Sequence, residues 1–235
     1  MLRTIFAAVV LVVVALVVDL PFLLVAWFSG VAGGLYPAAS MTLRLAFAAA
    51  GLRVRMEGED NIPSGACLFL ANHTSAVDTL AFFISVPKRI AFMAKQELFR
   101  IPLLGLAMRR AQFVSVDRED REAAAASAKC AVGQLRQGIS MVIYPEGTRS
   151  PDGRLLPFKR GAFLIAIRAG RPVVPVTIIG AQEALPKGRW WIRPGEIVIR
   201  IHPAIDVSGY GDADREMLRE RVRNQIAGAL PVGSR

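Results

Sequence analysis

The chain has 235 residues with a formal net charge of +10, and 53% of its residues are hydrophobic. This length suits one domain, or one domain with a membrane anchor, and the mean hydropathy of +0.41 is too high for an ordinary soluble protein. Positive charge attracts anionic lipids, acidic ligands or nucleic acid, but the basic residues are scattered and lack a nucleic-acid-binding motif, so we predict no nucleic-acid partner.

The N-terminus holds most of the apolar excess. Residues 5–28 are apolar except for Asp19, and a helix of that length reaches across the roughly 30 Å core of a bilayer. A second apolar stretch, residues 35–52, follows a glycine-rich turn and carries Arg44. Two arrangements stay open: a single span, or a helical hairpin lying in one leaflet with Arg44 at the headgroups. Either one leaves the rest of the chain on the cytoplasmic side of the cell inner (cytoplasmic) membrane, against its anionic surface.

Strand and helix patterns alternate after this segment, which predicts a mostly parallel sheet flanked by helices. We therefore expect an N-terminal membrane-associated helical segment over residues 1–52 and an α/β domain over residues 53–235. In chain order, the expected elements are strands 52–58 and 66–71, helix 79–86, strand 89–94, helix 103–110, strand 112–117, helix 119–137, strand 140–144, helix 159–169, strands 173–179 and 196–201, and helix 214–230.

A histidine–aspartate pair follows the strand predicted over residues 66–71. His73 is one of only two histidines in the chain, and Asp78 comes five residues later. A carboxylate at this distance can accept the imidazole Nδ1–H and fix the tautomer, which leaves Nε2 free to take a proton from a substrate hydroxyl. The pattern is weak by itself, and a helix-capping or hydrogen-bonded structural histidine is the competing interpretation.

A second polar cluster, Tyr144–Arg149, follows another predicted strand and has the composition of an anion-binding loop. Gly147 permits close backbone approach, Thr148 offers a hydroxyl donor, and Arg149 can hold a phosphate with two hydrogen bonds. Glu146 either orients an arginine or contacts a ligand hydroxyl. A polar turn with a surface ion pair is the alternative. Together with the histidine, this cluster indicates an enzyme that moves a group onto the hydroxyl of a phosphorylated molecule.

The other cations and the two cysteines say less about function than the two polar clusters do. Lys95 and Arg118 each follow a predicted strand, and taken alone such residues are usually solvated charges. Cys67 and Cys130 form no CxxC pair, so we expect two buried thiols in a reducing compartment. The sequence contains no G-x-S-x-G nucleophile elbow, no P-loop and no metal-ligand spacing. The simplest mechanism is therefore direct attack by a substrate hydroxyl, with no covalent acyl-enzyme, no metal and no cofactor.

Four sequence blocks in a fixed order carry a resemblance to a known family. Between Gly58 and Ile179 the chain resembles the glycerolipid acyltransferases, and most closely the bacterial 1-acyl-sn-glycerol-3-phosphate acyltransferases. The blocks are Asn72-His73 with Asp78, which matches N-H-x4-D; Phe113–Arg118; Tyr144-Pro145-Glu146-Gly147-Thr148-Arg149, which matches F-P-E-G-T-R with Tyr for Phe; and Val174-Pro175-Val176. A stretch containing Lys95 matches between the first two.

The resemblance implies a reaction and a set of roles. His73 would deprotonate the hydroxyl of a lysophospholipid acceptor, which attacks the thioester of acyl-CoA or acyl carrier protein, while Asp78 holds the imidazole. Arg118 and residues 146–149, assisted by Lys95, would bind the acceptor phosphate, and the product would be phosphatidic acid. Two alternatives stay open: another acceptor, such as a lyso-ornithine lipid, and a non-catalytic lipid-binding membrane protein.

Overall fold

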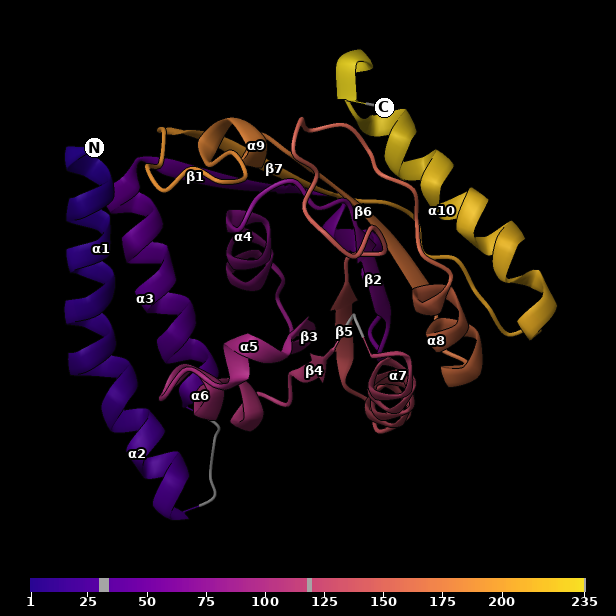
Figure 1. Ribbon diagram of the computed structural model, residues 1–235, viewed down its shortest axis with the longest axis horizontal. Coiled ribbons are helices and arrows are strands. Elements are labelled where there is room, and N and C mark those ends of the chain that lie inside the picture. Colours follow the sequence, from indigo (N-terminus) through magenta and orange to yellow (C-terminus); the bar gives the residue numbers. More distant parts are fainter. Residues whose placement is uncertain (30–33, 118–119, 235) are drawn as a thin grey trace.

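One sheet organises the α/β part of the molecule (Figure 1). Within residues 1–29, 34–117 and 120–234, which are described by a computed structural model, seven strands pair in the order β1-β7-β6-β2-β5-β3-β4. All neighbours are parallel except β6 and β7, which are antiparallel. The strands are β1 (Leu52–Glu57), β2 (Leu68–Ala71), β3 (Ile90–Lys95), β4 (Val114–Val116), β5 (Ser140–Ile143), β6 (Val173–Ile179) and β7 (Gly195–Ile201).

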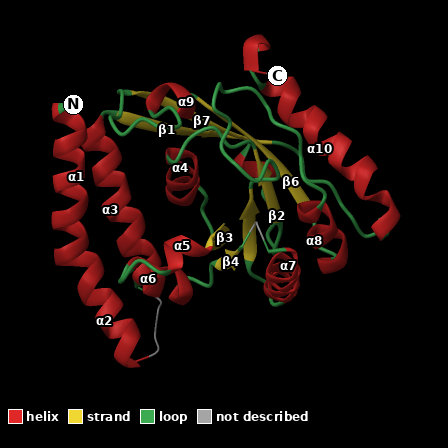
Figure 2. Ribbon diagram, viewed as in Figure 1, coloured by secondary structure: helices red, strands yellow, loops and turns green. Residues whose placement is uncertain are grey.

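Helices cover both faces of the sheet (Figure 2). Because the central strands are buried on both sides, they are continuous apolar runs, and all four residues of β2 are buried. Phe69 belongs to the core on one face and Leu70 to the core on the other. The first core includes α3 (Leu35–Ala50), α4 (Val77–Ser85) and α9 (Ala181–Ala184); the second includes α7 (Arg121–Arg136), α8 (Gly161–Ala169) and α10 (Arg215–Ala229).

The predicted α/β fold is confirmed, and each predicted strand and helix of the domain is present with its ends shifted by two residues or fewer. The short helices were not predicted, because one turn is too short to show a periodic pattern. Cys67 is buried as expected, whereas Cys130 is exposed, so its predicted burial is wrong. The elements that were not predicted are α5 (Gln96–Phe99), α9 and the 3₁₀ turns η2 (Glu59–Asn61), η3 (Asp212–Asp214) and η4 (Val232–Ser234), whereas α6 (Leu104–Arg110) is the helix predicted over residues 103–110.

The apolar N-terminal segment begins with one continuous helix. By length and composition Leu2–Val25 is able to cross a membrane, with a mean hydropathy of 3.0, and only Ala7 and Leu23 within it are buried. A π-helical turn lies just before Pro21, whose ring removes a backbone donor and crowds the preceding turn. The predicted glycine turn falls largely on residues 30–33, outside the described residues. The parts of the helix are α1 (Leu2–Val14), η1 (Ala15–Asp19) and α2 (Leu20–Ser29).

Polar contacts fix this long helix to the rest of the molecule. Near its start, the Thr4 hydroxyl accepts a hydrogen bond from the Ile192 amide at 2.9 Å, and near its middle Asp19 accepts one from Thr42 of α3 at 2.9 Å. The Arg44 guanidinium is exposed and donates to a main-chain carbonyl of α4, and its predicted placement at the headgroups stays a prediction. The predicted division at residues 52 and 53 stays a prediction; α3 ends and β1 begins at that point.

Candidate active site

The two polar clusters meet at one edge of the sheet. Strands β2 and β5 are parallel neighbours, with Leu70 opposite Ile143, so the segments that follow them leave at the same carboxyl edge. Asn72 fixes the first segment. Its Nδ2 donates to the Ile178 carbonyl at 2.9 Å, and its Oδ1 accepts from the Ile178 amide at 2.7 Å. These two bonds tie the end of β2 to β6 and set where the following histidine begins.

His73 and Asp78 form the pair that the sequence predicted. The imidazole Nδ1 lies 2.9 Å from Asp78 Oδ2, and the same oxygen accepts the backbone N–H of Thr74 at 2.7 Å and of Ser75 at 2.8 Å. Asp78 is fully buried, whereas the histidine side chain is 14% exposed. An ionised carboxylate can only accept hydrogen bonds, so it places the proton on Nδ1 and leaves Nε2 as the free basic atom.

Tyr144 supports the imidazole from one side. Its ring stacks on His73 with centroids 4.0 Å apart and an interplanar angle of 15°. Burial, and then the negative charge of Asp78, raise the pKa of the Tyr144 phenol well above its usual range. The phenol therefore stays protonated, and the ring acts as an apolar wall against which the imidazole is held flat.

The segment after β5 holds the main chain of His73 at both ends. Glu146 Oε1 accepts the His73 amide N–H at 2.7 Å, and the Ser150 amide donates to the His73 carbonyl at 2.8 Å. The second oxygen of Glu146 accepts the Leu156 amide N–H at 3.1 Å, and the side chain is only 3% exposed. Glu146 is thus a bridge between two backbone segments, with both of its oxygens already bound by amides.

Stability is expected to fall with rising pH because of Glu146. Burial raises the pKa of this carboxyl from 4.5 to about 7, although the amides of His73 and Leu156 oppose the shift. The folded chain keeps the proton to higher pH than the unfolded chain, so stability present below about pH 4.5 is lost as pH rises through about 7. The full effect is on the order of 3 kcal/mol.

Thermal unfolding of the purified protein between about pH 4.5 and 7.5 measures this effect. The unfolding temperature of the wild-type chain should decline across that range. Glu146→Gln cannot ionise, so its curve should be flatter, even though its absolute stability is lower because the amide offers only one acceptor oxygen to the two backbone donors. An identical slope in both proteins would assign the titration to another group.

A glycine and a lysine shape the loop between Glu146 and Ser150. Gly147 has a φ of +74°, and a Cβ at this position would lie 2.8 Å from Lys159 Cε. The backbone conformation therefore favours glycine here, and the end of the Lys159 side chain lies close to the glycine. The Lys159 side chain thus lies against the loop.

The other residues that were predicted to bind phosphate differ in exposure and in position. Thr148 is exposed and Arg149 half-buried, both beside the His73 segment. Lys95 is exposed at the end of β3, with its Nζ 3.7 Å from Glu97 Oε1. Arg118 lies outside the described residues. The predicted phosphate-binding roles of all these residues stay predictions.

The fourth block of the sequence lies in the centre of the sheet. Pro175 occupies β6 opposite Leu70 of β2, and its carbonyl accepts the His202 amide N–H at 3.0 Å. Asn72 and the strand that contains Pro175 therefore hold β6 against β2, the strand that precedes His73. Neither residue is part of the loop that contains Arg149.

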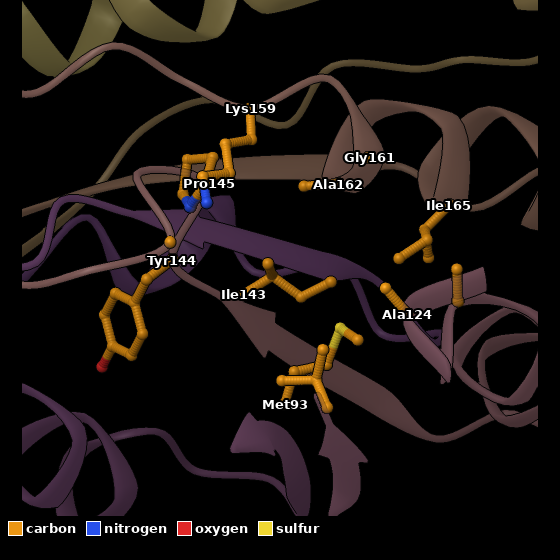
Figure 3. A pocket seen from close by; sticks show the side chains of 12 residues that line it. Met93, Ala124, Ile143, Tyr144, Pro145, Lys159, Gly161, Ala162 and Ile165 are labelled. Carbon is orange, nitrogen blue, oxygen red and sulfur yellow. The ribbon is translucent and has the colours of Figure 1, made fainter. Parts of the chain in front are cut away.

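An apolar cavity of about 210 Å³ begins at the same loop. Figure 3 shows Lys159 and Pro145 at one end, apolar side chains such as Met93 and Ile165 further in, and the Tyr144 ring directed away from them. The cavity lies among β3, β4, β5, α7 and α8. Its walls suit a hydrocarbon chain better than a polar ligand. It is lined by Met93, Val116, Ala124, Ala128, Ile143, Tyr144, Pro145, Gly147, Lys159, Gly161, Ala162 and Ile165.

Contacts from a distant segment also reach the site, and the sequence did not reveal them. The Ser75 hydroxyl donates to the Leu185 carbonyl at 2.7 Å. Lys187 Nζ donates to the Arg149 carbonyl at 2.8 Å. Both active-site loops are thus held by residues that follow α9. Such pairings depend on the tertiary fold, and no local pattern in the sequence marks them.

Comparisons with known proteins agree with this geometry. A family model described as Acyltransferase matches residues 53–179. A chloroplastic 1-acyl-sn-glycerol-3-phosphate acyltransferase, BAT2, from Brassica napus is 35% identical over 76% of this chain and 51% of its own length. The 1-acyl-sn-glycerol-3-phosphate acyltransferase of Borreliella burgdorferi is 30% identical over 77% of this chain and 73% of its own. The chain thus spans about half the length of the Brassica relative.

A solved structure shares the fold over nearly the whole chain. The crystal structure of the 1-acyl-sn-glycerophosphate (LPA) acyltransferase PlsC from Thermotoga maritima superposes with a TM-score of 0.82 and 29% sequence identity. The match covers 96% of this chain and 92% of the Thermotoga chain, so it includes the N-terminal helices as well as the sheet.

Proposed function

This chain belongs to the acyltransferase family, and from that premise we propose that it transfers an acyl group from acyl-CoA or acyl carrier protein to the free hydroxyl of 1-acyl-sn-glycerol-3-phosphate, giving phosphatidic acid. The observation that carries the proposal is the imidazole of His73, held 2.9 Å from the buried Asp78 carboxylate beside the loop that contains Arg149. The names of the relatives support the choice of acceptor.

The proposed reaction is a direct transfer with no covalent acyl-enzyme. Nε2 of His73 takes the proton of the acceptor hydroxyl as that oxygen attacks the thioester carbonyl. The carbon–sulfur bond then breaks, and the thiolate of the carrier leaves with the proton from the imidazolium. Asp78 stabilises the imidazolium through Nδ1 without itself being protonated, as in serine hydrolases. We propose that no metal and no cofactor take part; the acyl carrier is a co-substrate.

The acceptor phosphate is proposed to bind at the loop after β5. Arg149 supplies two parallel donors, Thr148 supplies a hydroxyl donor, Gly147 permits close approach of the backbone, and Lys159 adds positive charge. In the same scheme Lys95, at the end of β3 on the other side of β5, and Arg118 assist in binding the phosphate. Glu146 is proposed to position His73 rather than to contact phosphate, because both of its oxygens are already bound by amides.

Two features support a lipid substrate and a membrane location. The apolar cavity beside the loop offers a place for one acyl chain. The long N-terminal helix is fastened at Thr4 and Asp19 along the side of the molecule, which favours a helix lying in one leaflet over a perpendicular span. We propose that the protein lies on the inner (cytoplasmic) membrane with the catalytic domain on the cytoplasmic side.

The acceptor is tested with a panel of lysolipids. Purified full-length protein is given a labelled acyl donor, either acyl-CoA or acyl carrier protein, and acceptors with and without a phosphate monoester. 1-Acyl-sn-glycerol-3-phosphate should react fastest. A preference for lyso-ornithine lipid would overturn the proposed acceptor but keep the chemistry, and failure of every acceptor would favour a non-catalytic lipid-binding protein.

Arg149→Ala should raise the KM for the acceptor by about 10- to 100-fold, because a hydrogen-bonded pair with a charged group contributes about 1.5–3 kcal/mol. Initial rates at varied acceptor and fixed donor measure this. Arg154→Ala is the matched control, since that arginine follows in the same loop but is exposed and, among the residues that the structure describes, pairs only with Asp152. A rise in KM confined to the acyl donor would contradict the phosphate role.

A further inference from the structure

An exposed loop rich in tryptophan and basic residues joins α9 to β7. Residues 186–194, Pro-Lys-Gly-Arg-Trp-Trp-Ile-Arg-Pro, here called the tryptophan loop, contain three cations and no acidic residue. Trp190 is 61% exposed, and Lys187, Arg189 and Arg193 are all exposed. Within the described part of the chain, none of these cations forms an ion pair with a carboxylate. A large aromatic side chain left in water beside unpaired positive charge requires an explanation.

The side chains of the loop are arranged to present apolar and basic groups together. The guanidinium carbon of Arg189 lies 4.9 Å from the centre of the Trp191 ring, within cation–π range. The two tryptophan rings meet edge to face, with centroids 5.9 Å apart. The Arg193 amide donates to the Ala184 carbonyl at 2.8 Å and closes the base of the loop. The rings and charges therefore project from a fixed base.

The loop is continuous with the apolar surface of α1. The Ile192 amide donates to the Thr4 hydroxyl in the first turns of that helix. The Arg3 guanidinium and Pro194 both lie beside Gly51, which adds a fourth cation to the same region. Figure 1 shows the chain between α9 and β7 next to the N-terminal end of α1. Beyond Thr4 the helix exposes Ile5, Phe6 and Val9.

We infer that the tryptophan loop is a second membrane contact, which lies among anionic lipid headgroups at the surface that α1 enters. Tryptophan is enriched at the boundary between hydrocarbon and water, and each basic residue near an anionic surface adds attraction. Charge complementarity and continuity with α1 both select a lipid surface as the occupant. The inference rests on the proposed membrane location of α1 and α2.

This contact also reaches the active site. The residue just before the loop, Leu185, accepts the hydrogen bond from Ser75, and Lys187 holds the Arg149 carbonyl. Because these bonds join the base of the loop to both active-site segments, a loop seated among headgroups fixes the height of the site above the bilayer. The acceptor hydroxyl and the His73 imidazole then meet at a fixed height above the bilayer.

Quenching of tryptophan fluorescence by brominated lipids tests the inference in the full-length chain. Trp27→Phe leaves only Trp190 and Trp191 as emitters, and the double variant Trp190→Phe/Trp191→Phe leaves only Trp27 in α2. Both proteins are reconstituted into vesicles of phosphatidylcholine and phosphatidylglycerol, brominated either near the headgroup or near the chain end. The loop tryptophans should shift to the blue and be quenched mainly by bromine near the headgroup.

The two variants distinguish the membrane contact of the tryptophan loop from the membrane location of α2, on which it depends. Quenching of Trp27 without quenching of the loop overturns the second contact and keeps the membrane location of α2. Quenching of neither overturns both. Loop tryptophans quenched chiefly by bromine near the chain end would also overturn the inference, because they would then lie in the hydrocarbon core.

The charges are tested separately in the Trp27→Phe background. Arg189→Gln with Arg193→Gln should weaken the contact of the loop with phosphatidylglycerol vesicles about fivefold for each charge removed. Quenching should then approach the value in pure phosphatidylcholine. Lys129→Gln with Arg154→Gln removes the same charge from exposed sites elsewhere and should change nothing. Equal effects of the two pairs would mean that net charge, and not this loop, governs the contact.

Discussion

His73→Ala is expected to lower kcat by about 10²- to 10⁴-fold, while expression and membrane association stay near those of the wild-type protein. Nε2 is the atom left basic by the hydrogen bond from Nδ1 to Asp78, and alanine supplies no replacement. The fold should tolerate the change, because the His73 segment is held by main-chain hydrogen bonds at its amide and at its carbonyl. Initial rates with labelled donor, together with thermal unfolding, measure both quantities.

The second histidine provides the matched control. His202 pairs through Nε2 with the Thr177 hydroxyl at 2.8 Å, and burial lowers the pKa of its imidazole. His202→Gln keeps a hydrogen-bonding side chain at that position, so kcat should change by no more than a few-fold. Turnover that survives in His73→Ala, or that is lost equally in His202→Gln, would remove His73 from the mechanism.

Asp78→Asn tests the charge of the carboxylate with little change of shape. Oδ2 accepts three hydrogen bonds, whereas Oδ1 is a buried atom without a hydrogen-bond partner among the described residues. An asparagine whose oxygen takes the place of Oδ2 can keep all three bonds and loses the charge that stabilises the imidazolium, while its NH2 group takes the place of Oδ1. We expect kcat to fall by about 10²- to 10⁴-fold with the KM values nearly unchanged.

Asp78→Ala is the contrasting variant. It leaves the buried backbone amides of Thr74 and Ser75 without a hydrogen-bond acceptor, at a cost of about 1–3 kcal/mol for each donor. This variant should lose both activity and stability, whereas Asp78→Asn should lose mainly activity. If the two variants show the same stability and the same rate, the carboxylate does not organise the segment around His73.

The framework of the site could be predicted from the sequence, because buried parallel strands appear there as short apolar runs. β2 and β5 were recognisable, and the polar residues after each were expected at one edge of the sheet, where His73 and Arg149 now lie. Side-chain contacts between distant segments were not predictable. Glu146 was assigned to phosphate from its motif, yet the fold gives its oxygens to two amides that only tertiary structure brings near.

Exposure was harder to predict than secondary structure. The helix that carries Cys130 is rich in alanine, and small residues on every side leave its buried face poorly marked, so the exposed thiol was misplaced. Arg44 was expected at the lipid surface because long cations often extend there. That placement stays a prediction. The exposed side chain also donates to a carbonyl of α4, forty residues away in the chain, and no local pattern marked this contact.

The two hydrogen bonds that fix the His73 main chain have a consequence for acceptor selectivity. Its amide and its carbonyl are both bound by the segment that contains Gly147 and Arg149, so any headgroup that displaces this segment displaces the imidazole with it. A shift of about 1 Å can cost 10²-fold in rate. An ill-fitting lysolipid should therefore be discriminated against after it has bound, as slow turnover, even when it occupies the site as readily as the correct one.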